Sequence, residues 1–134
     1  MGEHADHTTL PTHVNSAGES CARPLTYLSV CSGIEAATVA WHPLGWRAAA
    51  FAEIDKFPSA VLAHRYPATP NLGDFTRIQE ADVGAIDALV GGTPCQSFSV
   101  AGLRGGLADG RGNLALEYLK LAQRLRPRWL VWEN

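Results

Sequence analysis

The sequence predicts an α/β fold in which helices flank a parallel β-sheet. From Pro24 onward, apolar runs of strand length alternate with segments of helical pattern, as expected for parallel strands joined by crossover helices. The chain has 134 residues, of which 46% are hydrophobic and 18% are charged. This size and composition suit one globular domain with one hydrophobic core.

The first strand and helix come after a polar leader. Residues 1–23 are rich in His, Thr, Gly and Ser and lack apolar periodicity, so we expect them to form a disordered leader. Residues 25–31 are rich in β-branched and aromatic side chains and predict the first strand, with Cys31 buried in the sheet. Residues 35–41 are rich in alanine and predict a helix that stops before Pro43.

A second strand and helix come next. The apolar run of residues 46–51 predicts a strand that ends in Glu53 and Asp55. Pro58 suits the first turn of the following helix, which ends at Pro67.

The third apolar run leads into glycine-rich sequence. Residues 86–90 predict a strand, and the pair Gly91 and Gly92 predicts a sharp turn that exposes the next few residues. Residues 97–112 carry many glycines without a period and predict a long, mobile loop of functional importance.

The last helix and strand have the clearest pattern. Asn113 is a suitable helix cap, and Pro127 ends the helix. Four apolar residues recur along it at helical spacing and predict a stripe that faces the sheet: Leu114, Tyr118, Leu121 and Leu125. Residues 129–132 predict a fourth strand, which brings Glu133 to the carboxyl edge of the sheet. With about four strands readable, the sheet looks incomplete.

Composition excludes several classes of protein. The net charge of -2 indicates no general attraction to nucleic acid, so any DNA contact would be local. Three cysteines without metal-ligand spacing indicate neither a disulfide framework nor a zinc site. With no membrane-spanning run and no signal peptide, we expect a cytoplasmic protein. Three arginines are more typical of a solvated helix face: Arg124, Arg126 and Arg128.

Cys95 follows Pro94 at the carboxyl end of the third strand. Open α/β sheets place their chemistry at this edge, and the fixed φ of Pro94 would hold the thiol in a defined direction. A nucleophile fits this position, but free cysteine is also often a small buried residue. These residues alone leave both interpretations open.

Five short motifs occur in order, at residues 27–37, 53–55, 73–74, 91–96 and 132–134. Together they resemble the amino-terminal part of the catalytic domain of DNA cytosine-5 methyltransferases, over residues 24–134. The resemblance implies a Rossmann-like, S-adenosylmethionine-dependent methyltransferase fold, with DNA as substrate and no metal, as in restriction-modification enzymes. Where the family carries an aromatic residue and a second glycine in the first motif, this chain has Cys31 and Glu35.

The resemblance also implies roles for individual residues. The Cys95 thiolate would attack C6 of a flipped cytosine, so that C5 can accept a methyl group, and Glu133 would stabilise charge at N3. Glu53 would bind the ribose of the donor and Asp74 its adenine amino group, although Asp74 could instead stabilise a turn. The remaining expected donor contacts are Ser32, Gly33, Ile34, Phe75 and Leu114.

DNA contacts and missing segments complete the expectation. The resemblance suggests weaker substrate contacts from the loop after the nucleophile: Gln96, Ser97, Ser99, Arg104 and Arg111. The family continues with an arginine-rich motif, a target-recognition region and a final helix, which this sequence lacks. We therefore expect the catalytic half of an enzyme, inefficient alone and partnered by a carboxyl-terminal half. The alternative is a truncated, noncatalytic remnant that at most binds the donor.

Overall fold

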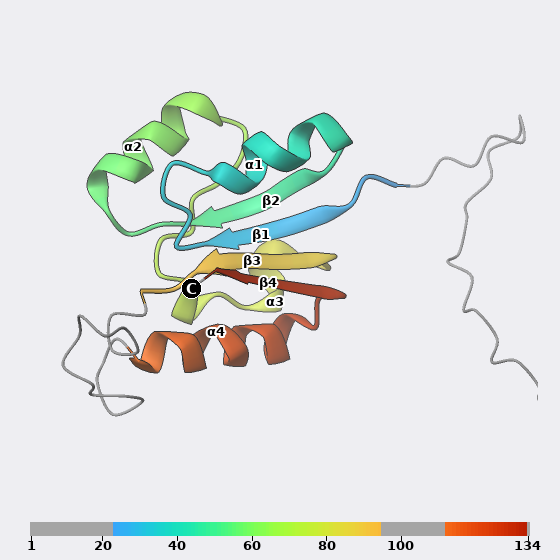
Figure 1. Cartoon of the computed structure of the whole chain (residues 1–134), viewed down its shortest axis with the longest axis vertical. Helices are drawn as coiled ribbons and strands as arrows, with labels where there is room; N and C mark the ends of the chain where they lie inside the picture. The colour runs from blue at the N-terminus through green and yellow to red at the C-terminus, as the bar shows by residue number, and fades with distance from the viewer. Residues whose placement is uncertain (1–22, 95–111, 134) are drawn as a thin grey trace, which may run out of the picture.

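The computed structural model describes residues 23–94 and 112–133, with side chains from residue 114 in the second range. Within these ranges, four strands form one parallel sheet in the order β2-β1-β3-β4 (Figure 1). The strands are β1 (Thr26–Val30), β2 (Arg47–Ala52), β3 (Ala88–Gly92) and β4 (Trp129–Glu133). The predicted α/β fold with a parallel sheet is confirmed.

Helices cover the sheet on both sides (Figure 1). On one side, the Tyr27 hydroxyl of β1 bonds to Thr38 Oγ1 of α1 at 2.6 Å. On the other side, the Tyr118 hydroxyl of α4 donates to the Leu89 carbonyl of β3 at 2.9 Å. The helices are α1 (Ala36–Trp41), η1 (His42–Leu44), α2 (Lys56–Arg65), η2 (Phe75–Arg77), α3 (Glu80–Val83) and α4 (Gly112–Leu125). The sequence did not predict the short elements η1, η2 and α3.

The hydrophobic core lies between α4 and the sheet. Leu28 of β1 pairs in register with Leu89 of β3, so both side chains point to the α4 side. The predicted stripe on α4 is confirmed, because Tyr118, Leu121 and Leu125 are all buried in this core. The helix then ends where Arg126 adopts the left-handed conformation, immediately before Pro127.

The predicted turn at Gly91 and Gly92 is wrong, because both residues belong to β3. Gly91 is required by close packing instead. A Cβ atom there would lie 2.6 Å from Val30 Cγ2 and 2.7 Å from the Val30 carbonyl oxygen. The strand therefore continues through the glycine pair, and the carboxyl edge of β3 lies two residues later than predicted.

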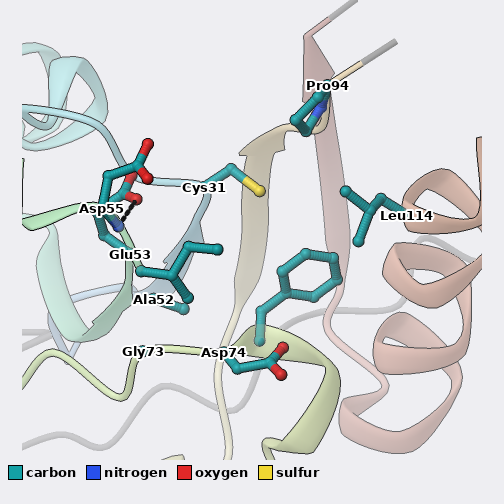
Figure 2. Close-up of a pocket in the computed structure, with 10 residues that line it drawn as sticks. Cys31, Ala52, Glu53, Asp55, Gly73, Asp74, Pro94 and Leu114 are labelled. Atoms are coloured by element: carbon teal, nitrogen blue, oxygen red, sulfur yellow. Dashed lines mark hydrogen bonds between the residues drawn. The ribbon is translucent and has the colours of Figure 1, made fainter. Parts of the chain in front are cut away.

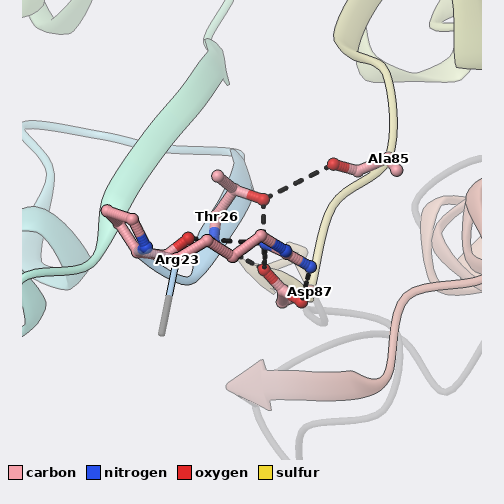
Figure 3. Close-up of polar contacts among 5 residues, drawn as sticks. Arg23, Thr26, Ala85 and Asp87 are labelled. Atoms are coloured by element: carbon pink, nitrogen blue, oxygen red, sulfur yellow. Dashed lines mark hydrogen bonds and ion pairs between the residues drawn. The ribbon is translucent and has the colours of Figure 1, made fainter. Parts of the chain in front are cut away.

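Asp87 joins three strands at the amino end of the sheet (Figure 3). Its carboxylate accepts two bonds from Arg23, each 2.7 Å long, and one from the Thr26 amide at 2.8 Å. Its backbone amide donates to the Thr26 carbonyl, and its carbonyl accepts from the amides of Arg128 and Trp129. The hydrogen bonds from Arg23 are the largest cause that lowers the pKa of Asp87.

The strand β4 is open to solvent. All five of its residues are exposed, and its four large apolar side chains are 42–48% accessible. Among the described strands, β4 pairs only with β3. Apolar surface of this extent on both faces of a strand is unusual for a finished sheet.

Replacing Asp87 tests the tie at the amino end of the sheet. We expect Asp87→Ala to lower the free energy of unfolding by about 2 to 4 kcal/mol, because it leaves the part-buried Thr26 amide without its acceptor. The folded-state pKa of Asp87 is depressed, so its stabilisation is complete at neutral pH and is lost as the pH falls through that pKa.

Urea unfolding at neutral and acidic pH measures both effects. The exposed Glu80→Ala is the control, since this carboxylate lies at the start of α3 and away from the sheet. An equal loss of stability in acid for Asp87→Ala and the unaltered chain would contradict the prediction.

Candidate active site

A cavity of about 180 Å³ opens at the carboxyl edge of the sheet. Figure 2 shows it enclosed by the ends of β1 and β2, the segment after residue 72, the end of β3 and the start of α4. Its lining residues are Cys31, Ala52, Glu53, Ile54, Asp55, Gly73, Asp74, Phe75, Pro94 and Leu114. Four predicted donor contacts therefore meet in one place: Glu53, Asp74, Phe75 and Leu114.

Glu53 presents a carboxylate that the backbone holds in place. Its Oε2 accepts a hydrogen bond from the Gly33 amide, and its Oε1 accepts one from the Asp55 amide, both at 2.8 Å. The residue is 8% exposed. Because each carboxylate oxygen has a second lone pair, both oxygens can still accept a bond from a hydroxyl group of a ligand. This arrangement suits the binding of a vicinal diol.

Asp74 both stabilises a turn and lines the cavity. Its Oδ1 accepts bonds from the Thr76 amide at 3.0 Å and the Thr76 hydroxyl at 2.7 Å, which caps η2. These bonds lower the pKa of Asp74, so its carboxylate is charged at neutral pH. Its Oδ2 lies 3.4 Å from Arg77 Nε. The turn role is confirmed, and contact with an adenine amino group stays a prediction.

Phe75 and Leu114 supply the apolar part of the lining. Phe75 is 5% exposed and belongs to the core, which fixes its ring. Arg124 of α4 braces the same segment, because it donates from Nε to the Ile78 carbonyl and from Nη2 to the Thr76 carbonyl, each at 3.2 Å. The prediction that Arg124 lies on a solvated face is therefore wrong.

Cys31 lies in the cavity wall, just beyond the sheet in which the sequence pattern placed it. It follows β1, is half-buried and has a positive φ of 50°. Burial, with a smaller effect of the Glu53 charge, raises the pKa of the Cys31 thiol to about 11. The thiol is thus protonated at neutral pH, which makes Cys31 a poor nucleophile.

The other predicted contacts in the first loop do not line the cavity. The Ser32 hydroxyl donates to the Ser29 carbonyl and accepts from the Ala52 amide, so it fastens the loop to β1 and β2. The backbone amide of Gly33 donates a hydrogen bond to the Glu53 carboxylate, and the Ile34 side chain is 56% exposed. Their contact with the methionine end of a donor stays a prediction.

The predicted nucleophile and its loop lie outside the described residues. This holds for Cys95, Gln96, Ser97, Ser99, Arg104 and Arg111, as it does for residues 1–22 of the predicted leader. Pro94, which directly precedes Cys95, lines the cavity. The predicted nucleophile is therefore the next residue in the sequence after a residue that lines the cavity.

Glu133 reaches the same edge from β4. It pairs in register with Gly92, and a Cβ atom on Gly92 would lie 2.6 Å from Glu133 Oε2. Gly92, three residues before Cys95 in the sequence, thus leaves room for the Glu133 carboxylate. The glycine pair serves the close packing of two neighbouring strands, not a turn.

Ile54 is a cavity residue that the sequence motifs did not single out. Ile54 is apolar but 74% exposed, and it lies between the acids Glu53 and Asp55 just after the end of β2. An apolar side chain between two acids in a loop at a strand end was the available signal, since such a residue lacks a core to join. Its exposed face can pack against a planar ring.

Metal-binding clusters and membrane spans are both missing from the described residues. In residues 23–94 and 112–133, no group of three or more His, Cys, Asp or Glu side chains could bind a metal ion. No helix within those same ranges has the length and apolar character needed to cross a membrane.

Comparisons with known proteins agree on a methyltransferase. The family model for C-5 cytosine-specific DNA methylases matches residues 25–134. The orphan methyltransferase M.Rho11sI of Bacillus phage rho11s is 40% identical over 114 residues, covering 82% of this chain and 23% of the relative. The type II methyltransferase M.AquIA of a Picosynechococcus strain is 37% identical over 116 residues, covering 80% of this chain and 47% of the relative.

Two further proteins are similar over most of this chain. A protein named DNA N-6-adenine-methyltransferase, from Escherichia phage P1, is 54% identical over 125 residues, covering 84% of this chain and 17% of that relative. A prophage-encoded E. coli protein, described as a DNA modification methyltransferase, shares the fold with a TM-score of 0.67 and 23% identity, over 82% of this chain and 32% of that protein. The chain spans less than half the length of each of these relatives.

The two glycines of β3 should respond differently to alanine. We expect Gly91→Ala to lower the free energy of unfolding by about 1 to 3 kcal/mol, because its Cβ meets the backbone of Val30. Gly92→Ala meets only the flexible end of Glu133, which can rotate away, so the loss of stability should be smaller. Thermal unfolding measures the difference, and a larger loss for Gly92→Ala would contradict this account.

Proposed function

Because the chain belongs to the C-5 cytosine-specific DNA methylase family, we propose that it supplies the donor-binding and nucleophilic half of an enzyme that methylates cytosine in DNA. The observation that supports this most is the convergence at one sheet edge. The cavity with Glu53 and Asp74 adjoins Pro94, directly before Cys95, and Glu133 ends the neighbouring strand. The reaction would take place in the cytoplasm.

The cavity lining fits S-adenosylmethionine. The Glu53 carboxylate would accept hydrogen bonds from the ribose diol through its remaining lone pairs, and the charged Asp74 carboxylate would accept one from the adenine amino group. The apolar side chains of Ile54, Phe75 and Leu114 would hold the adenine ring. When bound, this donor supplies an electrophilic methyl group on a sulfonium. No metal takes part in this proposal.

The chemistry on cytosine uses the other residues at this edge. The Cys95 thiolate adds to C6 of a flipped base, which forms a C–S bond and an enamine that is nucleophilic at C5. Glu133 stabilises the charge that develops at N3, through a hydrogen bond or a proton. C5 then takes the methyl group as the donor S–CH₃ bond breaks. Loss of the C5 proton to a base restores the C5=C6 double bond, as the C6–S bond breaks and releases the Cys95 thiolate.

The segment after Cys95 supplies the proposed contacts with DNA. We propose that Gln96, Ser97 and Ser99 contact the backbone or the vacated base position, and that Arg104 and Arg111 bind phosphate. A net charge of -2 supports local contacts rather than a broad basic surface.

We propose that a carboxyl-terminal half of the enzyme would bind at the open strand β4. Its apolar side chains Leu130 and Trp132 form a groove of about 110 Å³ with Leu119 and Tyr118 of α4. A further strand from a carboxyl-terminal half would pair with this edge and bury the groove. The same exposed surface favours the second candidate, a noncatalytic remnant that at most binds the donor.

Covalent trapping tests the proposed chemistry. DNA that contains 5-fluorocytosine blocks the last step, because fluorine cannot leave C5 as a proton does. We expect a covalent adduct between this DNA and the chain when the chain is mixed with the carboxyl-terminal half of a relative and with S-adenosylmethionine. The adduct should be absent in Cys95→Ser and strongly reduced in Glu133→Gln, as seen by denaturing electrophoresis.

Cys31→Ser is the matched control for the nucleophile. Since the raised pKa of Cys31 keeps its thiol protonated, the adduct should persist in that variant. An adduct that survives Cys95→Ser, or methylation of adenine without any cytosine adduct, would contradict the proposal.

A charge on β4 should separate the two halves. We expect Leu130→Lys to abolish copurification with the carboxyl-terminal segment of M.Rho11sI, because Leu130 lines the groove and a lysine at this 48% exposed position would be buried unpaired under the joining segment. Leu44→Lys is the control and should copurify, because Leu44 lies in η1, outside β4, and is 69% exposed. Equal copurification of both variants would show that β4 is not the joining edge.

A further inference from the structure

Asn71 makes four hydrogen bonds with its side-chain amide. Its Oδ1 accepts from the backbone amides of Glu53 at 2.9 Å and Gly73 at 3.1 Å. Its Nδ2 donates to the Glu53 carbonyl at 3.0 Å and to the Ser59 hydroxyl at 3.1 Å. The opposite orientation of the amide would set its NH₂ group against two N–H donors, so this network determines which atom is oxygen.

The position of Asn71 extends the sheet by side-chain bonds. Its neighbours Pro70 and Leu72 bond to the backbone of Phe51, each at 2.8 Å, and so add a short parallel segment beside β2. The regular strand ends at Ala52. The Asn71 amide then bonds to both backbone groups of Glu53, as a peptide group of a further strand residue would.

These contacts connect the two acidic residues of the cavity. Glu53 is fixed at its backbone by Asn71, with a further bond from the Ser59 hydroxyl to its carbonyl, and at its carboxylate by Gly33 and Asp55. Gly73, the other backbone partner of Asn71, directly precedes Asp74 and has a left-handed φ of 72°. One side chain thus holds the end of β2 and the loop of Asp74 at a set separation.

We propose that Asn71 is a positioning residue for the methyl donor, which keeps the carboxylate of Glu53 directed at the ribose diol and spaced from Asp74. The inference rests on the proposed function, in which these carboxylates bind ribose and adenine. Asn71 does not line the cavity, so it acts through Glu53 and Gly73 rather than by touching the donor. The Asn71 side chain is uncharged, so its effect on the two carboxylates is one of position.

Calorimetric binding of two ligands to the full chain tests this role. The ligands are S-adenosylhomocysteine and its analogue without the ribose 2′ and 3′ hydroxyls. We expect Asn71→Ala to weaken binding of the first by about tenfold, because the diol loses its aligned acceptor, and of the second by less than about twofold. A merely structural role would weaken both ligands equally, which would overturn the inference.

Amide hydrogen exchange without ligand provides a second measurement. Exchange at Glu53 and Gly73 should accelerate in Asn71→Ala, because both amides lose their acceptor. Asn71→Asp retains an acceptor oxygen and should keep both amides protected. Unchanged exchange in Asn71→Ala would also overturn the inference.

Ser59→Ala is the matched control. It removes one partner of Nδ2 and the 3.2 Å hydrogen bond from the Ser59 hydroxyl to the Glu53 carbonyl. It leaves the three bonds between Asn71 and the backbone of Glu53 and Gly73, so it should preserve the preference for the diol. If the unaltered chain binds neither ligand, the donor-binding proposal fails and the positioning role fails with it. If the unaltered chain binds both ligands equally, only the assignment of Glu53 and Asn71 to the diol fails.

Discussion

Asp87, through its carboxylate and its backbone, is the constraint on which the rest of the sheet depends. Parallel strands have no hairpin turns to set their register, so contacts at their ends must do so. Asp87 bonds to Thr26 at the start of β1 and, through its carbonyl, to Arg128 and Trp129 at the start of β4. A buried carboxylate would be costly without these partners, and the bidentate bond from Arg23 completes its coordination. The register of three strands is thereby fixed at one point.

The site at the opposite edge follows from that register. Because β1, β3 and β4 start together and run for five residues each, their ends also lie together. Val30 reaches the level of Gly91, and Glu133 reaches the level of Gly92. A shift of one residue in β4 would turn Glu133 to the other face of the sheet. The spacing between Asp87 and Gly92 is therefore a functional property of β3, and the two glycines permit the close approach that this packing needs.

The sequence predicted the features that depend on local pattern. Strand and helix periodicity identified the four described strands and the buried stripe on α4. The donor contacts that the family resemblance implied at Glu53, Asp74, Phe75 and Leu114 do line one cavity. It failed where a residue's role depends on a distant partner. The glycine pair suggested a turn because the proximity of Val30 and Glu133 cannot be read from β3 alone. Arg124 was misassigned for the same reason, since its partners are backbone carbonyls 46 and 48 residues away. Asn71 was given no role, since its partner Glu53 lies 18 residues away.

The two parts of the site differ in how far the described residues determine them. On the donor side, the backbone and carboxylate of Glu53 have partners within this chain, and Asp74 is held by Thr76. On the base side, Glu133 ends a strand whose apolar side chains are exposed on both faces. Electrostatic stabilisation at N3 needs a carboxyl group fixed in a site that excludes water, and an open edge strand does not provide one. The proposed donor pocket therefore has its partners within the described residues, whereas the proposed catalytic role of Glu133 requires a polypeptide that covers β4.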